Sequence, residues 1–176
     1  MHLEEEIAEL VRSRRGSEGR SVYIATAESA TAGRIADTLT NIPGSSEYLV
    51  GGVIAYTNEA KHRLLGVKTS SLRDYGAVSK EVACQMAEGG RIALAADLCV
   101  ADTGIAGPGG GTETKPVGLF FLALASPGAC EVKTFLFEGD REANKDAAVR
   151  AALTMLRDHL LQSDSQPSGA NEHDVV

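Results

Sequence analysis

The chain has 176 residues, of which 43% are hydrophobic, and its formal net charge is −7. This length suits one domain with its own hydrophobic core, and an acidic balance without a basic tract argues against a nucleic-acid partner. No window is long and apolar enough to cross a membrane, and the acidic, amphipathic start does not resemble a signal or transit peptide. We therefore expect neither a membrane nor a nucleic acid as partner.

The three cysteines, Cys84, Cys99 and Cys130, are far apart and form no Cys-x-x-Cys pair. Their odd number indicates a reducing compartment, because secreted domains usually pair their cysteines. The sequence therefore predicts a cytoplasmic protein without a zinc or other metal site.

Hydrophobic periodicity and helix-end signals divide the chain into alternating helices and strands. The expected helices span 3–15, 30–40, 58–65, 69–76, 79–96 and 141–161, and the expected strands span 21–26, 51–57, 97–103, 117–125 and 131–138. Strands separated by helices favour parallel pairing, and the turn at 126–129 makes the last two strands a hairpin. We expect one α/β domain over 1–162, with three αβα layers and a mixed, partly parallel sheet. A disordered polar tail is expected over 163–176.

Three polar residues share one position in this scheme, because each lies at or just beyond the carboxyl end of an expected strand. They are Ser29, Tyr56 and Thr103. If these strands run parallel, the three side chains meet at one edge of the sheet, where open α/β sheets place their ligand sites. The sequence therefore predicts a site at this edge.

Ser29 itself has two interpretations. A serine before a helix is a common N-cap, and the local sequence lacks the Gly-x-Ser-x-Gly pattern of one class of serine hydrolases. A serine on a tight corner at a helix start can instead be a nucleophile, with the backbone N–H groups of 29–33 stabilising an oxyanion. The local context favours the cap, and the position at the sheet edge favours the nucleophile.

A serine nucleophile needs a base, and the helix after the second strand offers Lys61 and His62. Consecutive helical residues point about 100° apart, so only one of them can face the site squarely. Lys61 lies five residues after Tyr56, and its long side chain can reach back over the strand end as in Ser–Lys hydrolases. Its pKa, ordinarily ~10.4, must be lowered by burial or by a neighbouring cation such as Arg34 or Arg63. The alternative is a solvated surface lysine.

The segment GIAGPGGGTETKP, residues 104–116, has five glycines in its first eight positions. It matches neither the P-loop pattern nor the dinucleotide-binding pattern. It is either a flexible crossover or a nest of backbone N–H groups for a phosphate. At the start of the last helix, Asp140 suits an N-cap and Arg141 suits a phosphate partner.

The acidic residues do not indicate a two-carboxylate hydrolase. Glu28 adjoins Ser29, and Asp97 and Asp102 flank a strand, but none has a convincing partner in the sequence. Cys99 lies in an apolar strand and suits a core position. A cysteine amidase has little support, because no histidine lies near Cys84 or Cys130 in the sequence.

Five motifs follow one another over residues 21–160: AESATAG, IPGSSEYLVGGVIAYTNEAKHRLLGV, GAVSKEVACQMAEG, ADTGIAGPGGGTETKPVG and FEGDRE. Together they resemble the bacterial CinA carboxy-terminal domain family. Its standalone members include nicotinamide-nucleotide amidases, which convert nicotinamide mononucleotide to nicotinate mononucleotide and ammonia in pyridine-nucleotide recycling. Longer members carry an additional amino-terminal domain.

The resemblance implies a nucleophile, Ser29, and a base, Lys61, with Tyr56 assisting in the same network. The substrate-binding residues that it implies are Thr31, Gly33, Thr103, Gly104, Gly107 and Arg141. It also implies nicotinamide mononucleotide as substrate, no metal and no cofactor. A small domain of this kind is expected to form a homo-oligomer.

This sequence departs from the family pattern at two positions. The family usually has Cys or Leu where this chain has Ala30, and Gly where it has Ala32. We interpret Ala30 as a packing change, whereas the methyl group of Ala32 is expected where the helix start approaches the substrate. Two alternatives therefore stay open: a catalytically silent pyridine-nucleotide-binding domain, and a Ser–Lys amidase acting on another small amide.

Overall fold

The computed structural model describes residues 2–18 and 21–163, so the expected polar tail lies outside the described residues except for its first position. The helices are α1 (Leu3–Glu18), α2 (Arg34–Thr40), α3 (Asn58–Leu65), α4 (Thr69–Asp74), α5 (Lys80–Ala93) and α6 (Arg141–Ser163), with a short 3-10 helix η1 (Ser45–Glu47). The strands are β1 (Ile24–Glu28), β2 (Leu49–Ile54), β3 (Leu98–Gly104), β4 (Leu119–Ser126) and β5 (Ala129–Leu136).

The five strands form one sheet in the order β2-β1-β3-β4-β5. β1 pairs in parallel with both β2 and β3, whereas β3–β4 and β4–β5 are antiparallel. The expected mixed sheet is confirmed. Because β1 lies between two parallel neighbours, the carboxyl ends of β2, β1 and β3 lie next to one another at one edge.

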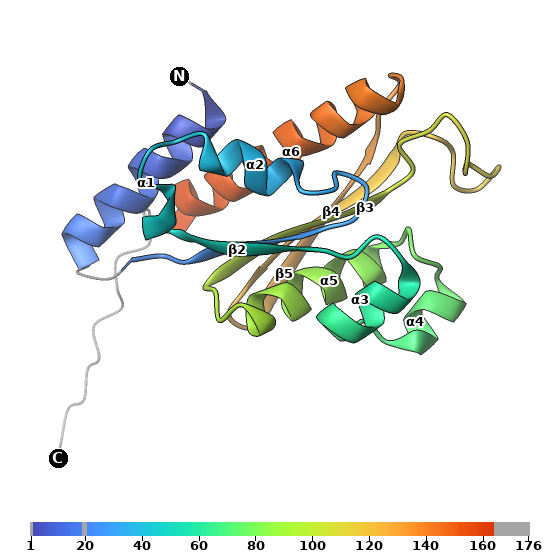
Figure 1. The fold of residues 1–176 in the computed structure, drawn as a ribbon, viewed down its shortest axis with the longest axis horizontal. Coiled ribbons are helices and arrows are strands. Elements are labelled where there is room, and N and C mark those ends of the chain that lie inside the picture. Colours follow the sequence, from blue (N-terminus) through green and yellow to red (C-terminus); the bar gives the residue numbers. More distant parts are fainter. Residues whose placement is uncertain (1, 19–20, 164–176) are drawn as a thin grey trace, which may run out of the picture.

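Helices cover both faces of the sheet, which gives the expected αβα layers (Figure 1). Helices α1, α2 and α6 lie on one face, over a core that includes Ile24, Leu122 and Leu156. Helices α3, α4 and α5 lie on the other face, where Met86 and Cys99 belong to a second core. Every described helix is too short or too polar to cross a lipid bilayer.

Two local features define where elements of the fold begin and turn. Thr57 caps α3, because its hydroxyl accepts a hydrogen bond from the N–H of Ala60 at 3.1 Å. This cap places Lys61 in the first turn of α3, directly beyond the end of β2. At the far end of the sheet, Gly128 takes a left-handed φ of 76° and closes the β4–β5 hairpin.

The cysteines differ from the expectation. The sulfur atoms of Cys84 in α5 and Cys130 in β5 are bonded to each other, and Cys99 is buried as a free thiol. The expected lack of pairing is therefore wrong for Cys84 and Cys130. They are 46 residues apart in the sequence, but α5 packs across β5 and brings them together. The odd number of cysteines consequently gives no support to a reducing compartment.

Candidate active site

The segment from Ser29 to Gly33, between β1 and α2, is a tight non-helical corner. The helix begins at Arg34 rather than at the expected residue 30, and its N-cap is Gly33, which has a left-handed φ of 97°. Ser29 makes no capping hydrogen bond, and its own N–H donates to Asp102 at 2.9 Å. The N-cap interpretation of Ser29 is therefore wrong.

Two fully buried carboxylates hold this corner. Asp102, on β3, accepts hydrogen bonds from the N–H groups of Ser29, Ala30 and Thr31 at 2.8–3.2 Å and from the Thr31 hydroxyl at 2.5 Å. Glu28, the last residue of β1, accepts from the same hydroxyl at 2.7 Å. Neither acid has a recognisable partner in the sequence, although Glu28 ends β1 and Asp102 lies near the end of the neighbouring β3.

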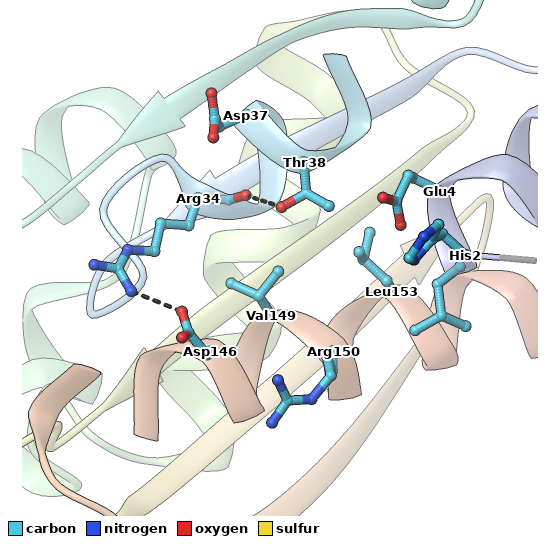
Figure 2. A pocket seen from close by; sticks show the side chains of 10 residues that line it. His2, Glu4, Arg34, Asp37, Thr38, Asp146, Val149, Arg150 and Leu153 are labelled. Carbon is cyan, nitrogen blue, oxygen red and sulfur yellow. Dashed lines mark hydrogen bonds and ion pairs between the residues drawn. The ribbon is translucent and has the colours of Figure 1, made fainter. Parts of the chain in front are cut away.

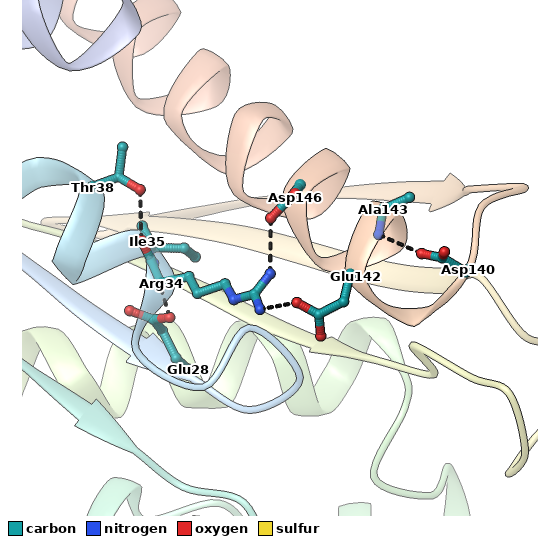
Figure 3. A network of polar contacts seen from close by, with 8 residues as sticks. All are labelled: Glu28, Arg34, Ile35, Thr38, Asp140, Glu142, Ala143 and Asp146. Atoms are coloured by element: carbon teal, nitrogen blue, oxygen red, sulfur yellow. Dashed lines mark hydrogen bonds and ion pairs between the residues drawn. The ribbon is translucent and has the colours of Figure 1, made fainter.

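Glu28 also fixes the start of α2. Its carboxylate accepts from the N–H groups of Gly33, Ile35 and Ala36 at 2.8–3.1 Å. A carboxylate is stable there because the first N–H groups of a helix have no partner within the helix. Figure 3 shows Glu28 beneath the first turn of α2, next to Ile35.

The corner presents Ser29 to Lys61. The Nζ of Lys61 lies 2.9 Å from the Oγ of Ser29 and also donates to the backbone oxygens of Ala55 at 3.0 Å and Tyr56 at 3.4 Å. Both side chains are buried, at 7% exposure for Ser29 and 2% for Lys61. His62 instead places its Nδ1 2.9 Å from the backbone oxygen of Val67, so Lys61 is the group that faces Ser29.

Burial lowers the pKa of Lys61 below its ordinary value, and the negative charge of Asp102 partly offsets this shift. The cations expected to lower this pKa have other partners. Arg34 pairs with Glu142 and Asp146 of α6 (Figure 3), and Arg63 pairs with Glu59. Burial, rather than a neighbouring cation, therefore favours the neutral amine.

Ser29 and Lys61 line a cavity of about 260 Å³. One wall is the glycine-rich segment from Gly104 to Gly110, and the segment before α5, at Ala77 and Val78, forms another. Arg141 of α6 also lines the cavity. Three segments that are far apart in the sequence thus meet around the Ser29 hydroxyl.

The glycine-rich wall is anchored to the start of α6. The buried side chain of Asn144 donates to the backbone oxygens of Ala106 at 3.1 Å and Gly139 at 2.9 Å. Arg141 donates to the backbone oxygen of Gly107 at 2.7 Å. Gly107 has a left-handed φ of 94°, and a Cβ there would approach the Val117 side chain to 2.6 Å. The loop therefore has a defined shape here, and the flexible-crossover interpretation fails for this part.

The other predicted site residues have different surroundings. The Tyr56 hydroxyl accepts a hydrogen bond from Arg141 at 3.1 Å and is not part of the Ser29–Lys61 contact. Thr103 lines the cavity, but its hydroxyl donates to the backbone oxygen of Ala77 at 2.8 Å. Thr31 and Gly33 do not line the cavity, and both instead bind the buried carboxylates. They shape the corner.

The expected oxyanion donors at 29–33 are also wrong, because the acids already bind most of these N–H groups. Ala106 and Gly107 offer an alternative on the glycine-rich wall of the cavity. Both residues are buried and line the cavity, and their N–H groups make no hydrogen bond within the described part of the chain. Buried N–H groups normally have a partner, so this wall suits a bound anion or oxyanion.

Ala32 is exposed, does not line the cavity and has a left-handed φ of 54°. Its departure from the family pattern therefore affects the backbone and not a substrate contact. We expect Ala32→Gly to raise the free energy of unfolding by about 0.5–1 kcal/mol, because glycine relieves the left-handed strain. The check is chemical unfolding beside Ala36→Gly, a control within α2 that should lower it by about 1 kcal/mol. Equal losses in both variants would contradict the strain at Ala32.

A larger cavity of about 600 Å³ lies between α1, α2 and α6 (Figure 2). Among the described residues that line it, no nucleophile contacts a base: the Thr38 hydroxyl donates to the backbone oxygen of Arg34, and Arg34 pairs with Asp146. The smaller cavity is therefore the better candidate for chemistry. Among the described residues, Cys84, Glu88 and Cys130 bring two sulfur atoms and a carboxylate within 4.8 Å of one another, but the two sulfur atoms are bonded to each other and are not free thiolate ligands. None of them lines the cavity beside Ser29.

Comparison with known sequences shows the family of the chain. A CinA-like protein of Chloroherpeton thalassium is 46% identical over 164 residues, which cover 91% of this chain and 38% of that protein. A CinA-like protein of Geobacter sulfurreducens is 48% identical over 142 residues, covering 81% of this chain and 34% of that protein. The chain thus matches less than two-fifths of the length of these curated relatives.

Solved structures agree with the sequence comparison. The competence/damage inducible protein CihA from Agrobacterium tumefaciens has a TM-score of 0.83 at 41% identity, with 91% of this chain and 96% of that chain covered. The competence damage-inducible protein A from Klebsiella pneumoniae has a TM-score of 0.83 at 32% identity, with 92% and 98% covered. The CinA C-terminal domain matches residues 3–160, and the chain therefore belongs to the CinA family.

Proposed function

We propose that this chain hydrolyses the carboxamide of nicotinamide mononucleotide to give nicotinate mononucleotide and ammonia. The observation that carries the proposal is the 2.9 Å contact between the buried Lys61 amine and the Ser29 hydroxyl. A buried lysine with a lowered pKa is a suitable base for a serine nucleophile. The resemblance to nicotinamide-nucleotide amidases supplies the substrate.

The proposed reaction has two halves. The Oγ of Ser29 attacks the carboxamide carbon while Lys61 takes the hydroxyl proton. Lys61 then gives that proton to the departing nitrogen, so that ammonia leaves and an acyl-enzyme ester forms. Water attacks the ester, with Lys61 again accepting a proton and returning it to Ser29. The net reaction consumes one water and needs neither a metal nor a cofactor.

The tetrahedral intermediate carries a negative oxygen that needs donors. We assign this role to the N–H groups of Ala106 and Gly107, which are buried, line the cavity and lack other partners in the described chain. Fixed donors in a site shielded from water stabilise developing charge strongly. Asn144 and Arg141 hold the two adjacent carbonyl groups, so the donors are preorganised.

Arg141 supports a phosphorylated substrate. Its guanidinium lines the cavity between the Tyr56 hydroxyl and the backbone of Gly107, and it has no carboxylate partner among the described residues. Arginine binds phosphate through charge-assisted hydrogen bonds. In this proposal Arg141 and the Tyr56 hydroxyl contact the phosphate, and Gly104 and Thr103 line the space between it and Ser29.

The test is a deamidation assay on the purified chain. Nicotinamide mononucleotide should yield equal amounts of ammonia and nicotinate mononucleotide, and Ser29→Ala should lose this activity. Ser13→Ala, at the exposed surface of α1, is the matched control and should retain it. Full activity of Ser29→Ala would disprove the serine mechanism.

Two other outcomes have defined meanings. Tight binding of the mononucleotide in calorimetry, without product in chromatography, would identify a silent nucleotide-binding domain. Turnover of a different small amide in a substrate panel, still dependent on Ser29, would keep the Ser–Lys mechanism and replace the substrate. A cytoplasmic location and a homo-oligomer belong to this proposal and stay predictions.

A further inference from the structure

The two buried carboxylates that hold the Ser29 corner, Glu28 and Asp102, receive more short contacts than the donor groups around them have hydrogen atoms to give. Asp102 and Glu28 together receive eight contacts of 2.5–3.2 Å. Six come from backbone N–H groups, and the other two come from the single hydroxyl of Thr31. The Thr31 hydroxyl has one hydrogen and can donate it to only one of the two acids. With both acids ionised, its other short contact would bring a lone pair of the hydroxyl oxygen against a negatively charged carboxylate oxygen.

An additional proton on the pair removes this conflict. A protonated carboxyl group at either acid donates to the Thr31 oxygen, and the Thr31 hydroxyl donates to the other acid. Both acids are fully buried, and two like charges so close together disfavour ionisation of both. The proton belongs to the pair rather than to one residue.

The charge of this pair decides what Lys61 can do. Asp102 acts on Lys61 electrostatically, and its negative charge favours the ammonium form, which cannot accept a proton. With both acids ionised, the corner would hold two negative charges against one buried lysine. With one shared proton, the corner holds a single negative charge and the neutral amine becomes accessible.

The other titratable groups near Glu28 and Asp102 do not supply a positive charge that would balance the second carboxylate. Cys99 on β3 lies in the second core, against α5, and burial raises the pKa of its thiol to about 12, so it stays neutral. Arg34 follows the corner, but its guanidinium turns to Glu142 and Asp146. Lys61 is therefore the charged group whose state the pair controls.

We propose that Glu28 and Asp102 share one proton through the Thr31 hydroxyl at the pH of catalysis. This acid pair positions Ser29 and keeps the charge of the corner low enough for Lys61 to act as a base. The inference rests on the proposed Ser–Lys function for its catalytic consequence, but the shared proton itself is independent of any substrate. Burial, with a smaller contribution from the charge of Glu28, raises the pKa of Asp102 to about 6, although the hydrogen bonds from Thr31 and Ser29 lower it. The net shift has the direction that a shared proton requires, and the Thr31 hydroxyl between the two acids carries the inference.

Infrared spectroscopy of the folded protein tests the proton directly. Ordinary carboxyl groups are ionised above about pH 5, so a protonated-carboxyl band at about pH 7 would come from an unusual group. We expect this band in the unmodified protein and its loss in Asp102→Asn and in Glu28→Gln. The absence of the band from the unmodified protein would overturn the proposal, whether or not the chain deamidates nicotinamide mononucleotide.

The pH dependence of kcat/KM gives a second test. The rise of kcat/KM with pH on the acidic side of the profile, its acidic limb, reports the deprotonation of Lys61. Asp102→Asn leaves the corner with one negative charge, as the shared proton does, so the limb should stay within about half a pH unit even if kcat falls. A shift of the limb to lower pH by a full unit would show that Asp102 is ionised in the unmodified protein and would overturn the proposal.

The bridging hydroxyl is tested by a pair of substitutions. Thr31→Val removes the hydroxyl at constant shape and should lower kcat by about 10-fold or more, because Ser29 loses its fixed position. Thr31→Ser keeps the hydroxyl and should lose much less. Thr26→Val is the matched control, since the buried Thr26 hydroxyl on β1 has no hydrogen-bond partner in the described structure. Equal losses in Thr31→Val and Thr31→Ser would contradict the bridge.

Discussion

Lys61→Met is expected to lower the rate of deamidation by roughly 10⁴-fold or more, because Ser29 then has no base within hydrogen-bond distance. Methionine matches the length and burial of the lysine stem, so the loss would report the missing amine. The measurement is ammonia release under saturating substrate. Lys80→Met, at the exposed start of α5, is the control and should keep the full rate.

Lys61→Met should also change how the free energy of unfolding depends on pH. The pKa of Lys61 is lower in the folded protein than its ordinary value of 10.5, so the unfolded chain binds more protons between those two values. The free energy of unfolding of the unmodified protein therefore rises with pH over this interval and stops rising above about pH 10.5. Lys61→Met lacks this component. A stability difference between the two proteins that is constant from neutral pH to about pH 10.5 would show that the pKa of Lys61 is not lowered.

Arg141→Ala is expected to raise KM for nicotinamide mononucleotide by about 10- to 100-fold, with a much smaller change in kcat. The expected size corresponds to one lost charge-assisted interaction of about 1.5–3 kcal/mol. The phosphate is remote from the bond that breaks, so the loss of its contact should fall on binding. The smaller loss in kcat comes from the Gly107 carbonyl, which Arg141 also holds, while Asn144 still holds the neighbouring Ala106 carbonyl. Steady-state kinetics with the mononucleotide measure both constants.

The control for this prediction is Arg150→Ala. Arg150 lies on the same helix but lines the larger cavity, away from Ser29. We expect its KM to equal that of the unmodified protein. A raised KM in Arg150→Ala with a normal KM in Arg141→Ala would move the phosphate to the larger cavity and contradict the assignment of Arg141.

Much of the layout follows from local patterns in the sequence. Alternating helices and strands predicted the mixed sheet, and the parallel order of β2, β1 and β3 is confirmed. That order explains why residues as distant as Ser29 and Lys61 meet: each follows a strand end at the same edge. The reach of a lysine side chain over that edge was also predictable from the spacing after Tyr56.

The buried acids could not be predicted in the same way. Glu28 and Asp102 are 74 positions apart, and no periodicity shows that β1 and β3 pair in the register that brings Ala27 beside Ala101 and so places the two acids close together. For the same reason the helix start was misplaced by four residues. Sequence rules assign the N–H groups of 29–31 to a helix or a cap, whereas in the folded chain a carboxylate from β3 binds them.

The ion pairs of Arg34 also join two parts of the candidate site. Arg34 directly follows the corner that carries Ser29, and it binds Glu142 and Asp146 in the same turns of α6 that begin with Arg141. These ion pairs therefore connect the segment that carries Ser29 to the start of the helix that carries Arg141. Under the proposed function, nicotinamide mononucleotide is expected to contact both residues, whereas nicotinamide without its ribose phosphate is expected to contact only the Ser29 side.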